Sequence, residues 1–336
     1  VAFPIVVAVL NNTEEEEDWY AAAKIYREFV ITSAVWTQQG PLSQRKDVPL
    51  WAQELTVWVN SHWQNNDIFD KSGGAPAVVE ERVLDIVERF GLGNGTLGLH
   101  WYEWDTLGYV SGSNYSNCGS EITCGFDTHY PEYFPVRQNF QASLERMQQV
   151  GVRVTPYING RIFDQATESW TDHSHEAKHA ACKSTPASLL PDKKNIPLQL
   201  YNETYGSKAE FAVMCPHTQY WQHTLAGVVG ELAHTYNTDG VYIDQIAAAG
   251  PRPCWDPSHN HSLGGGHHWQ SGYAALLGSV RKNAGNSKLL LTESNAEPFM
   301  SGIDMFLTLV GFSVGDLSPP APGAAEQATY IVPAFQ

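Results

Sequence analysis

Two carboxylates in the sequence follow apolar runs of the kind that form buried strands. Asp244 ends the run GVYID, and Glu293 ends the run KLLLTE. An unpaired charge is costly to bury in a protein core, so we ask what chemistry the two acids could do together. Two carboxylates can cleave a glycosidic bond, because one attacks or stabilises the anomeric carbon while the other protonates the leaving oxygen. The pattern alone is equally consistent with two structural hydrogen-bond acceptors.

Strand-like and helix-like segments alternate from residue 54 onward, and these elements must position the acids. Apolar runs predict strands at 55–60, 96–104, 152–159, 240–244, 288–293 and 303–309, with a last candidate at 329–335. Helical spacing predicts helices near 78–90, 137–149, 219–235 and 269–283. A long insertion follows the strand that ends at residue 159. This alternation predicts βαβ units and a parallel sheet.

Seven candidate strands approach the eight of a closed barrel. The predicted fold class is therefore α/β, a (β/α)8 TIM barrel of which this chain holds all or only a part. An open doubly wound sheet is the alternative, but no GxGxxG motif follows the first strand. A TIM barrel holds its active site at the carboxyl ends of its strands, which is where both acids lie.

Other polar and aromatic residues share this position at predicted strand ends. We interpret them as substrate-binding residues: His62, Trp63, Trp101, Glu103, Trp104, Asp105, Asn159, Arg161 and Gln245. Glu103 and Asp105 could accept hydrogen bonds from sugar hydroxyls, Trp104 could stack on a sugar, and Gly160 could let the backbone approach a ligand. The alternative for the WYEWD segment is packing within the barrel.

The segment NTDGVYIDQIAAAGPRPCWDPSHNHSLGGGHHWQSGYAALL, followed by KLLLTESNAEPF, resembles the barrel of retaining α-glycoside hydrolases. The resemblance is to the endo-α-N-acetylgalactosaminidase family and to related uncharacterised glycoside-hydrolase-like proteins, and it extends from about residue 54 to 336. It implies that Asp244, in a DGVYxD-type strand, is the nucleophile and that Glu293 is the acid/base. The wider α-galactosidase group usually has Asp as its second acid, and Glu297 is an alternative acid/base four residues on.

The resemblance also implies a division into domains. Residues 1–50, with a predicted strand at 1–10, a helix at 14–30 and a linker from 37, are expected to be the tail of a β-sandwich. Residues 51–336 are expected to be the catalytic barrel. The chain stops inside a predicted strand, so we expect the C-terminal part of the barrel to be missing.

The implied activity is hydrolysis of α-linked sugars of the galactose or N-acetylgalactosamine type by a retaining double displacement. Asp244 should then be ionised and Glu293 protonated, which requires a less polar or more negative environment around the glutamate. A retaining enzyme holds its two carboxyl groups about 5–5.5 Å apart, against roughly 6.5–9.5 Å in an inverting enzyme.

The loop CWDPSHNHSLGGGHHW, after the presumed nucleophile strand, carries four histidines and three glycines. Its spacing fits no recognised zinc motif, so we predict no metal and no cofactor. His261 and the glycines are instead expected to shape a sugar pocket, and Glu297 to contribute to it.

Composition and charge narrow the range of partners. The net charge of −16 disfavours nucleic acid and anionic membranes as partners, and no apolar stretch approaches the roughly 18 residues of a membrane span. The 11 Trp and 15 Tyr are consistent with a neutral carbohydrate partner, because aromatic faces commonly hold sugars.

Sequons and cysteines favour a secreted, extracellular glycoprotein. Cys118 and Cys124 lie in a short polar loop in which a disulfide would close easily. The candidate glycosylation sites are Asn11, Asn94, Asn114, Asn202 and Asn260. These features keep a second function open, a non-catalytic structural or carbohydrate-binding glycoprotein of an extracellular assembly, built on the same barrel.

Overall fold

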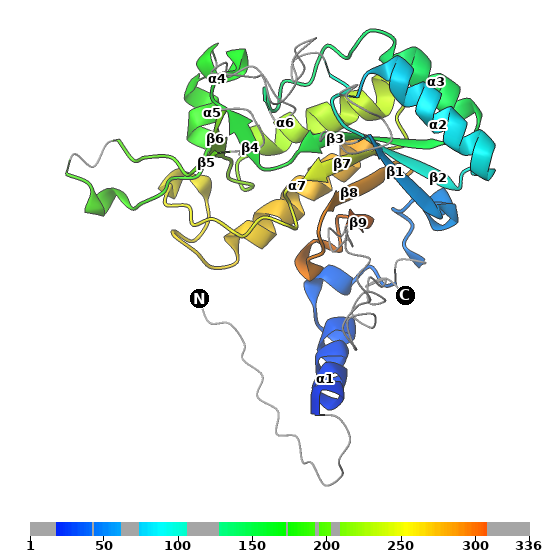
Figure 1. Ribbon diagram of the computed structural model, residues 1–336. Coiled ribbons are helices and arrows are strands. Elements are labelled where there is room, and N and C mark those ends of the chain that lie inside the picture. The colour runs from blue at the N-terminus through cyan, green and yellow to red at the C-terminus, as the bar shows by residue number, and fades with distance from the viewer. Residues whose placement is uncertain are drawn as a thin grey trace, which may run out of the picture.

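The computed structural model describes residues 18–41, 44–61, 74–105, 128–172, 174–191, 195–202 and 209–307. These residues form a curved parallel sheet with helices on its outer side, a smaller antiparallel sheet beside it, and a helix that extends away from both (Figure 1). Within these ranges no helix is long and apolar enough to cross a membrane.

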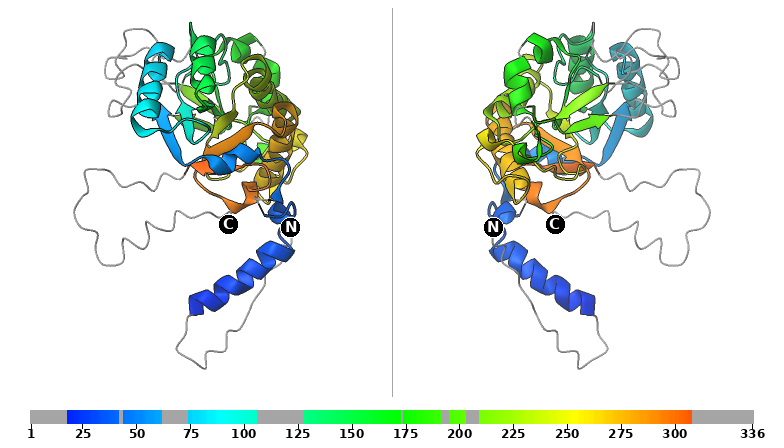
Figure 2. Two further views of the ribbon diagram at one scale, coloured as in Figure 1. Left: turned by 90° about the vertical axis from the view of Figure 1, so that its right-hand side faces the viewer. Right: turned by 90° about the vertical axis from the view of Figure 1, so that its left-hand side faces the viewer.

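The main sheet curls into a half-barrel (Figures 1 and 2). Its strands within the described ranges are β1 (Val57–Ser61), β2 (Leu97–Trp101), β3 (Arg153–Asn159), β7 (Gly240–Asp244), β8 (Leu289–Glu293) and β9 (Met305–Leu307). They lie in the order β1-β2-β3-β7-β8-β9, and every pair of neighbours is parallel. The carboxyl ends of all these strands therefore meet at one edge.

Helices link successive strands and cover the outer face of the sheet. They are α2 (Pro76–Phe90), α3 (Phe140–Gln149), α6 (Gln219–Gly230) with a π-helical turn at Glu231–Thr235, and α7 (His268–Ala284). In α2 a proline occupies the first turn, where its missing N–H breaks no bond, and Gly91 ends the helix with a φ of 65°. The same helix buries Val79 and Val83 against the sheet.

The long insertion after β3 folds as a separate antiparallel sheet. Its strands are β4 (Ile162–Asp164), β5 (Leu200–Asn202) and β6 (Glu210–Val213), in the order β4-β6-β5. Two short helices, α4 (Glu168–Asp172) and α5 (Ser174–Ala180), lie between β4 and β5. Single 3-10 turns occur at Val35–Thr37, Leu50–Glu54, Ala187–Leu189, Pro257–His259 and Glu297–Phe299.

The strand and helix pattern read from the sequence is confirmed throughout the described part of the barrel, with differences of a few residues at element ends. The helix predicted at 14–30 corresponds to α1 (Asp18–Thr32), which projects from the barrel (Figures 1 and 2). The strands predicted at 1–10 and 329–335 lie outside the described residues. The antiparallel sheet of the insertion was not predicted.

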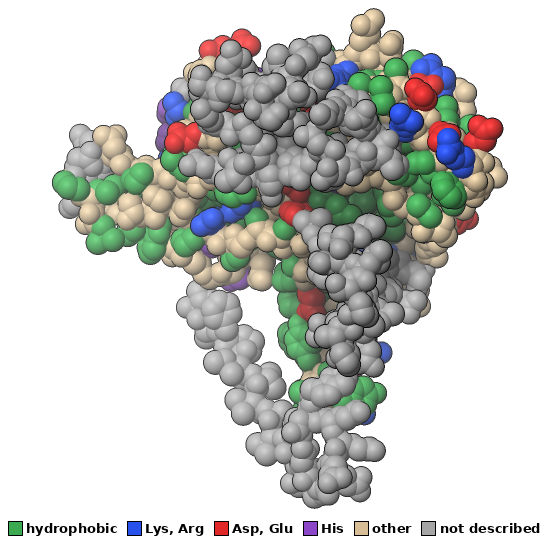
Figure 3. Space-filling model, in the orientation of Figure 1, with side chains coloured by type: hydrophobic (Ala, Val, Ile, Leu, Met, Phe, Trp, Pro, Cys, Tyr) green, Lys and Arg blue, Asp and Glu red, His purple; other side chains and the backbone are tan. Residues whose placement is uncertain are grey.

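The two faces of the main sheet carry different side chains. On β2, Trp101 packs outward against Phe140 of α3 with ring centroids 4.8 Å apart, while His100 points inward and lies 4.0 Å from the ring of Tyr242. This follows from the alternation of side chains along a strand. The outer surface is charged: Figure 3 shows acidic and basic side chains gathered over α2 and α3, where Arg89 pairs with Asp85 at 2.7 Å.

Candidate active site

Asp244 and Glu293 end the adjacent strands β7 and β8. Tyr242 pairs with Leu291 in the register of these strands, so two residues later Asp244 stands beside Glu293. On the other side of β7, Asn159 at the end of β3 pairs with Asp244. Parallel pairing thus places one amide and two carboxyl groups in a row at the carboxyl edge of the sheet.

Three hydrogen-bond donors converge on the partly buried Asp244 carboxyl group. Tyr157 Oη donates to Oδ2 at 3.0 Å, Asn159 Nδ2 donates to the same oxygen at 3.4 Å, and Tyr242 Oη donates to Oδ1 at 3.3 Å. The Tyr157 hydroxyl in turn receives a hydrogen bond from Tyr130 Oη at 3.2 Å. Hydrogen bonds to a carboxylate favour its ionised form, so this network stabilises a negative charge on Asp244.

The two acids also act on each other. Asp244 and Glu293, side by side at the ends of β7 and β8, each shift the pKa of the other. Burial and the charge of Glu293 raise the pKa of Asp244 to about 8, against the lowering effect of the tyrosine donors. Burial also raises the pKa of Glu293. Two carboxyl groups this close behave as one titrating pair, which holds a single proton over much of the range between acidic and neutral pH.

Aromatic rings form the inner wall below the acids. The His100 ring lies 4.4 Å from Tyr102 and 4.0 Å from Tyr242, and the Tyr102 ring lies 4.6 Å from Tyr157. These residues belong to β2, β3 and β7 or follow them directly, on the face that also carries Asp244. The wall excludes water from one side of the acid pair, which is the environment that raises both carboxyl pKa values.

The segment after β3 fixes the position of Asn159. Its Oδ1 accepts hydrogen bonds from the backbone N–H groups of Arg161 at 2.9 Å and Ile162 at 3.1 Å, and its own N–H donates to Tyr133 Oη at 2.6 Å. Gly160 donates its N–H to the Asp244 carbonyl at 3.0 Å. A Cβ at Gly160 would lie 2.6 Å from Ile243 Cγ2. Gly160 thus permits close packing of β3 on β7, where the sequence suggested an approach to a ligand.

Gln245 and Arg161 continue the row away from the acids. Gln245 follows Asp244 with a φ of 63° and is mostly buried. Its Oε1 accepts a hydrogen bond from Arg161 Nη1 at 3.4 Å. The Arg161 guanidinium lies 5.3 Å from the ring centre of Tyr201, and burial lowers its pKa. Gln245 therefore joins Arg161 to the strand end that carries Asp244, and substrate binding by these two residues stays a prediction.

The WYEWD segment is buried, and its two tryptophans pack in the core. Trp101 and Trp104 are fully buried, and their indole N–H groups donate to the carbonyls of Gly74 at 2.9 Å and Tyr157 at 2.8 Å. Both pack against Phe140, so the structure places them in the core rather than in a sugar-binding position. Glu103, with a φ of 51°, and Asp105 are also buried. The charges of Asp105 and Asp244 both raise the pKa of Tyr133, after the larger effect of burial.

Two other predicted site residues have contacts of a different kind. Glu297 begins the turn Glu297–Phe299 and accepts a hydrogen bond from Tyr26 of α1. The acid whose charge raises the pKa of Asp244 is Glu293. His261 contacts Cys215, with 3.3 Å between Nε2 and Sγ, in a cluster described below.

The remaining predicted positions are scattered. His62, Trp63, Asn11, Asn114, Cys118 and Cys124 lie outside the described residues. Asn94 is exposed in the loop before β2, at the opposite end of the strands from the acids, Asn202 ends β5, and Asn260 is exposed after the turn Pro257–His259. The described cysteines, Cys182, Cys215 and Cys254, are free and buried.

Sequence reasoning missed the two tyrosines that hold Asp244. The signal was present, because Tyr157 and Tyr242 lie two residues before Asn159 and Asp244 and must share their face of the sheet. The cysteine and histidine cluster had no such signal, because Cys215 lies far in the chain from the loop that holds the other three members.

Two known proteins are similar to this chain in sequence. A "Putative glycoside hydrolase 22789" from Monosiga brevicollis is 39% identical over 335 residues, 99% of this chain and 26% of the relative. A "Putative glycoside hydrolase" from Bacteroides thetaiotaomicron is 34% identical over 290 residues, 86% of this chain and 36% of the relative. The chain thus spans about a quarter to a third of the length of these relatives.

A solved structure shares the fold at low sequence identity. The α-N-acetylgalactosaminidase NagBb from Bifidobacterium bifidum, in complex with Gal-NHAc-DNJ, is similar with a TM-score of 0.57 and 16% identity, over 84% of this chain and 41% of that one. A family model described as a domain of unknown function, DUF6259, matches residues 7–116 and 122–336. The chain therefore belongs to the DUF6259 family.

Proposed function

We propose that this protein is a retaining glycoside hydrolase of α-linked sugars of the galactose or N-acetylgalactosamine type. The observation that carries the proposal is the position of Asp244 and Glu293 side by side at the ends of β7 and β8, with the Tyr157 and Tyr242 hydroxyls donating to Asp244. A pair of carboxyl groups in unequal surroundings is what acid and nucleophile roles require.

The roles follow from the surroundings of each acid. Asp244, stabilised as an anion by Tyr157 and Tyr242, attacks the anomeric carbon and forms a covalent glycosyl ester. Glu293 gives its proton to the leaving oxygen as the glycosidic bond breaks. Glu293, now ionised, then takes a proton from water, and the resulting hydroxide displaces Asp244 from the anomeric carbon. Two inversions at that carbon retain its configuration.

The shared proton must rest on Glu293 when the sugar arrives. The donors to Asp244 favour this arrangement because they stabilise its carboxylate. Burial of Glu293 favours the neutral form of the glutamate, against the interaction with Asp244, which lowers its pKa. The neighbouring positions of the two acids on the paired strands β7 and β8 also support retention, because an inverting enzyme holds its carboxyl groups further apart to leave room for a water molecule.

The names of the two relatives support glycosidase chemistry, and the likeness to NagBb supports the barrel as its scaffold. We propose in addition that the fold is a (β/α)8 barrel and that the protein is a secreted glycoprotein that binds a carbohydrate. A glycan at exposed Asn94 would lie at the opposite end of the strands from the acids.

A panel of aryl α-glycosides tests the activity. Wild type should release the aryl group from an α-galactoside or α-N-acetylgalactosaminide, and Asp244→Asn and Glu293→Gln should lose about 10³-fold or more in kcat/KM. Glu297→Gln is the matched control and should keep most of the activity. The anomeric configuration of the first sugar released, read by proton NMR, should be α.

Covalent trapping tests the role of Asp244 directly. A 5-fluoro-α-glycosyl fluoride should label one peptide of the wild type, and tandem mass spectrometry should place the label on Asp244. A label on another acid, or a β-configured first product, would overturn the mechanism. Equal background hydrolysis by wild type and Asp244→Asn on every substrate, together with sugar binding by both, would favour the non-catalytic carbohydrate-binding protein.

A further inference from the structure

A cluster of thiols and imidazoles lies apart from the acids. Cys215 follows β6 and precedes α6, while Cys254, His259 and His261 lie in the loop between β7 and α7. One donor atom from each of these four side chains lies within 4.8 Å of the others. Three of the four side chains are buried and His261 is half-buried. Thiolates and imidazoles are the ligands that zinc prefers in proteins.

Backbone hydrogen bonds aim the imidazole lone pairs at the thiols. His259 Nε2 donates to the His179 carbonyl, so in the neutral ring Nδ1 carries the lone pair, and this atom lies 3.3 Å from Cys254 Sγ. His261 Nδ1 donates to the Ser262 carbonyl at 2.9 Å, which leaves the lone pair of Nε2 toward Cys215 Sγ at 3.3 Å. A second nitrogen bound to a carbonyl is the usual way in which a protein orients a metal-binding histidine.

The spacing and charge of the four donors suit one ion. Tetrahedral zinc, with Zn–S of about 2.3 Å and Zn–N of about 2.0–2.1 Å, holds its donors about 3.3–3.8 Å apart. The two 3.3 Å contacts match this spacing. Two thiolates and two neutral imidazoles around Zn²⁺ have no net charge, which removes the cost of burying the thiolates unpaired.

We propose that Cys215, Cys254, His259 and His261 bind one structural Zn²⁺. Cys182, the third buried thiol, is not one of these four residues. Sequence reasoning set a metal aside because the histidine loop alone has no zinc spacing. The fold supplies the missing ligand, because Cys215 precedes Cys254 by about 40 residues and meets it only in the folded chain.

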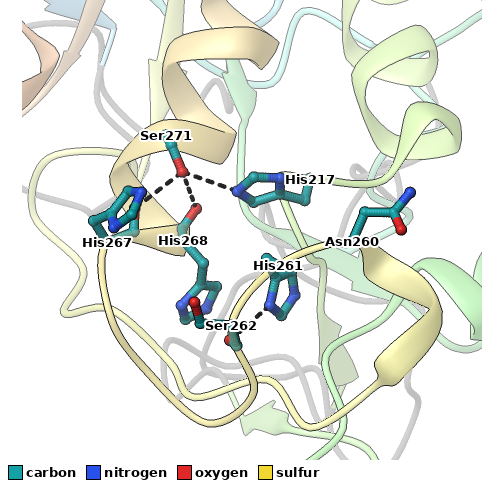
Figure 4. A pocket seen from close by; sticks show the side chains of 7 residues that line it. All are labelled: His217, Asn260, His261, Ser262, His267, His268 and Ser271. Carbon is teal, nitrogen blue, oxygen red and sulfur yellow. Dashed lines mark hydrogen bonds between the residues drawn. The ribbon is translucent and has the colours of Figure 1, made fainter. Parts of the chain in front are cut away.

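The ion would fasten the loop that follows the presumed nucleophile strand. That loop is tied to the insertion by backbone bonds such as Trp255 N–H to the Lys183 carbonyl at 3.1 Å. Beside the cluster, His217, His261 and His268 line a cavity of about 610 Å³ (Figure 4). The rings of His261 and His268 stack 4.5 Å apart. Zinc would thus hold one wall of this cavity in place.

Metal analysis of the whole chain tests the proposal without reference to activity. Protein purified from zinc-supplemented medium without chelators should contain about one Zn²⁺ per chain, and Cys254→Ser and His259→Ala should lose at least nine tenths of it. Cys182→Ser and His217→Ala, which alter neighbours that are not ligands, should keep it. Co²⁺ exchanged into the wild type should give the thiolate charge-transfer and strong d–d absorption of a tetrahedral site.

A disulfide is the competing state of three adjacent thiols. Alkylation before and after reduction, followed by peptide mapping, should find Cys182, Cys215 and Cys254 all unpaired. A disulfide among them in freshly purified protein, or wild type with less than about a tenth of an equivalent of zinc and no cobalt spectrum, would overturn the proposal. So would loss of the metal in Cys182→Ser. Wild-type metal content and the cobalt spectrum decide the question even if the ligand variants do not fold.

Discussion

At the scale of residues, Asp244 and Glu293 make the free energy of unfolding depend on pH. The pKa of Asp244 is raised from 3.8 to about 8 by burial and by the charge of Glu293, so between these values the folded protein holds a proton that the unfolded chain loses. Stability from this group is fully present below about pH 3.8 and is lost as pH rises through about 8. A pair kept at such a cost is typical of a functional site.

Glu293→Gln should therefore stabilise the fold while it removes activity. The amide has no charge to oppose ionisation of Asp244, so the melting temperature should exceed that of the wild type at pH 8, by roughly 1–2 kcal/mol in unfolding free energy, and match it near pH 4. Thermal melts from pH 4 to 9 measure this. Glu297→Gln, which loses only the contact with Tyr26, should show no such pH-dependent gain, and parallel curves for Glu293→Gln and wild type would contradict the prediction.

Tyr157→Phe tests whether the Tyr157 hydroxyl stabilises the Asp244 carboxylate. Loss of the 3.0 Å hydrogen bond removes about 1.5–3 kcal/mol of stabilisation from the carboxylate, so we expect kcat/KM to fall about 10- to 100-fold. The pKa of Asp244 should rise further, which moves the acidic limb of the pH–activity profile to higher pH. Tyr130→Phe, one hydrogen bond further away, should have a smaller effect. Equal effects of the two variants would argue against a role in supporting Asp244.

At the scale of elements, the sequence pattern predicted what depends on local periodicity. Strands β7 and β8 end at Asp244 and Glu293, as their apolar runs indicated, and βαβ alternation then brings the two acids to one edge. It did not predict which side of β2 faces inward, so Trp101 was assigned to the site although it packs on α3. Contacts between distant segments, such as Cys215 with His261, have no local signal at all.

Gly160 shows how closely β3 and β7 must pack to align their ends. In Gly160→Ala the new Cβ would meet Ile243 at 2.6 Å and Ile246 at 2.9 Å, so overpacking should cost about 1–3 kcal/mol. Gly227→Ala in α6, where nothing lies within 4 Å, should instead stabilise by about 0.5–1 kcal/mol, because alanine favours the helix. Urea unfolding of both variants measures the contrast. Equal midpoints would mean that the β3–β7 junction yields easily.

At the scale of the whole molecule, the N-terminal segment is joined to the barrel by a buried cation. Arg45 donates to the Met300 carbonyl at 2.6 Å and lies 3.4 Å from Asp304, which also pairs with Arg281 of α7 and accepts the Leu290 N–H at 2.9 Å. Burial raises the pKa of Asp304 despite these cations. The linker predicted from residue 37 is thus anchored at Arg45, before the expected domain boundary at residue 50.

Arg45→Met should destabilise the junction between the N-terminal segment and the barrel. Removal of one partner from a buried ion pair costs about 3–5 kcal/mol. Because Arg281 still neutralises Asp304, we expect a loss of about 2–3 kcal/mol in unfolding free energy, together with faster proteolytic cleavage between α1 and β1. Lys46→Met, at the exposed neighbouring position, should change stability by less than about 0.5 kcal/mol. Similar stability and cleavage rates for both variants would show that residues before 50 fold independently of the barrel.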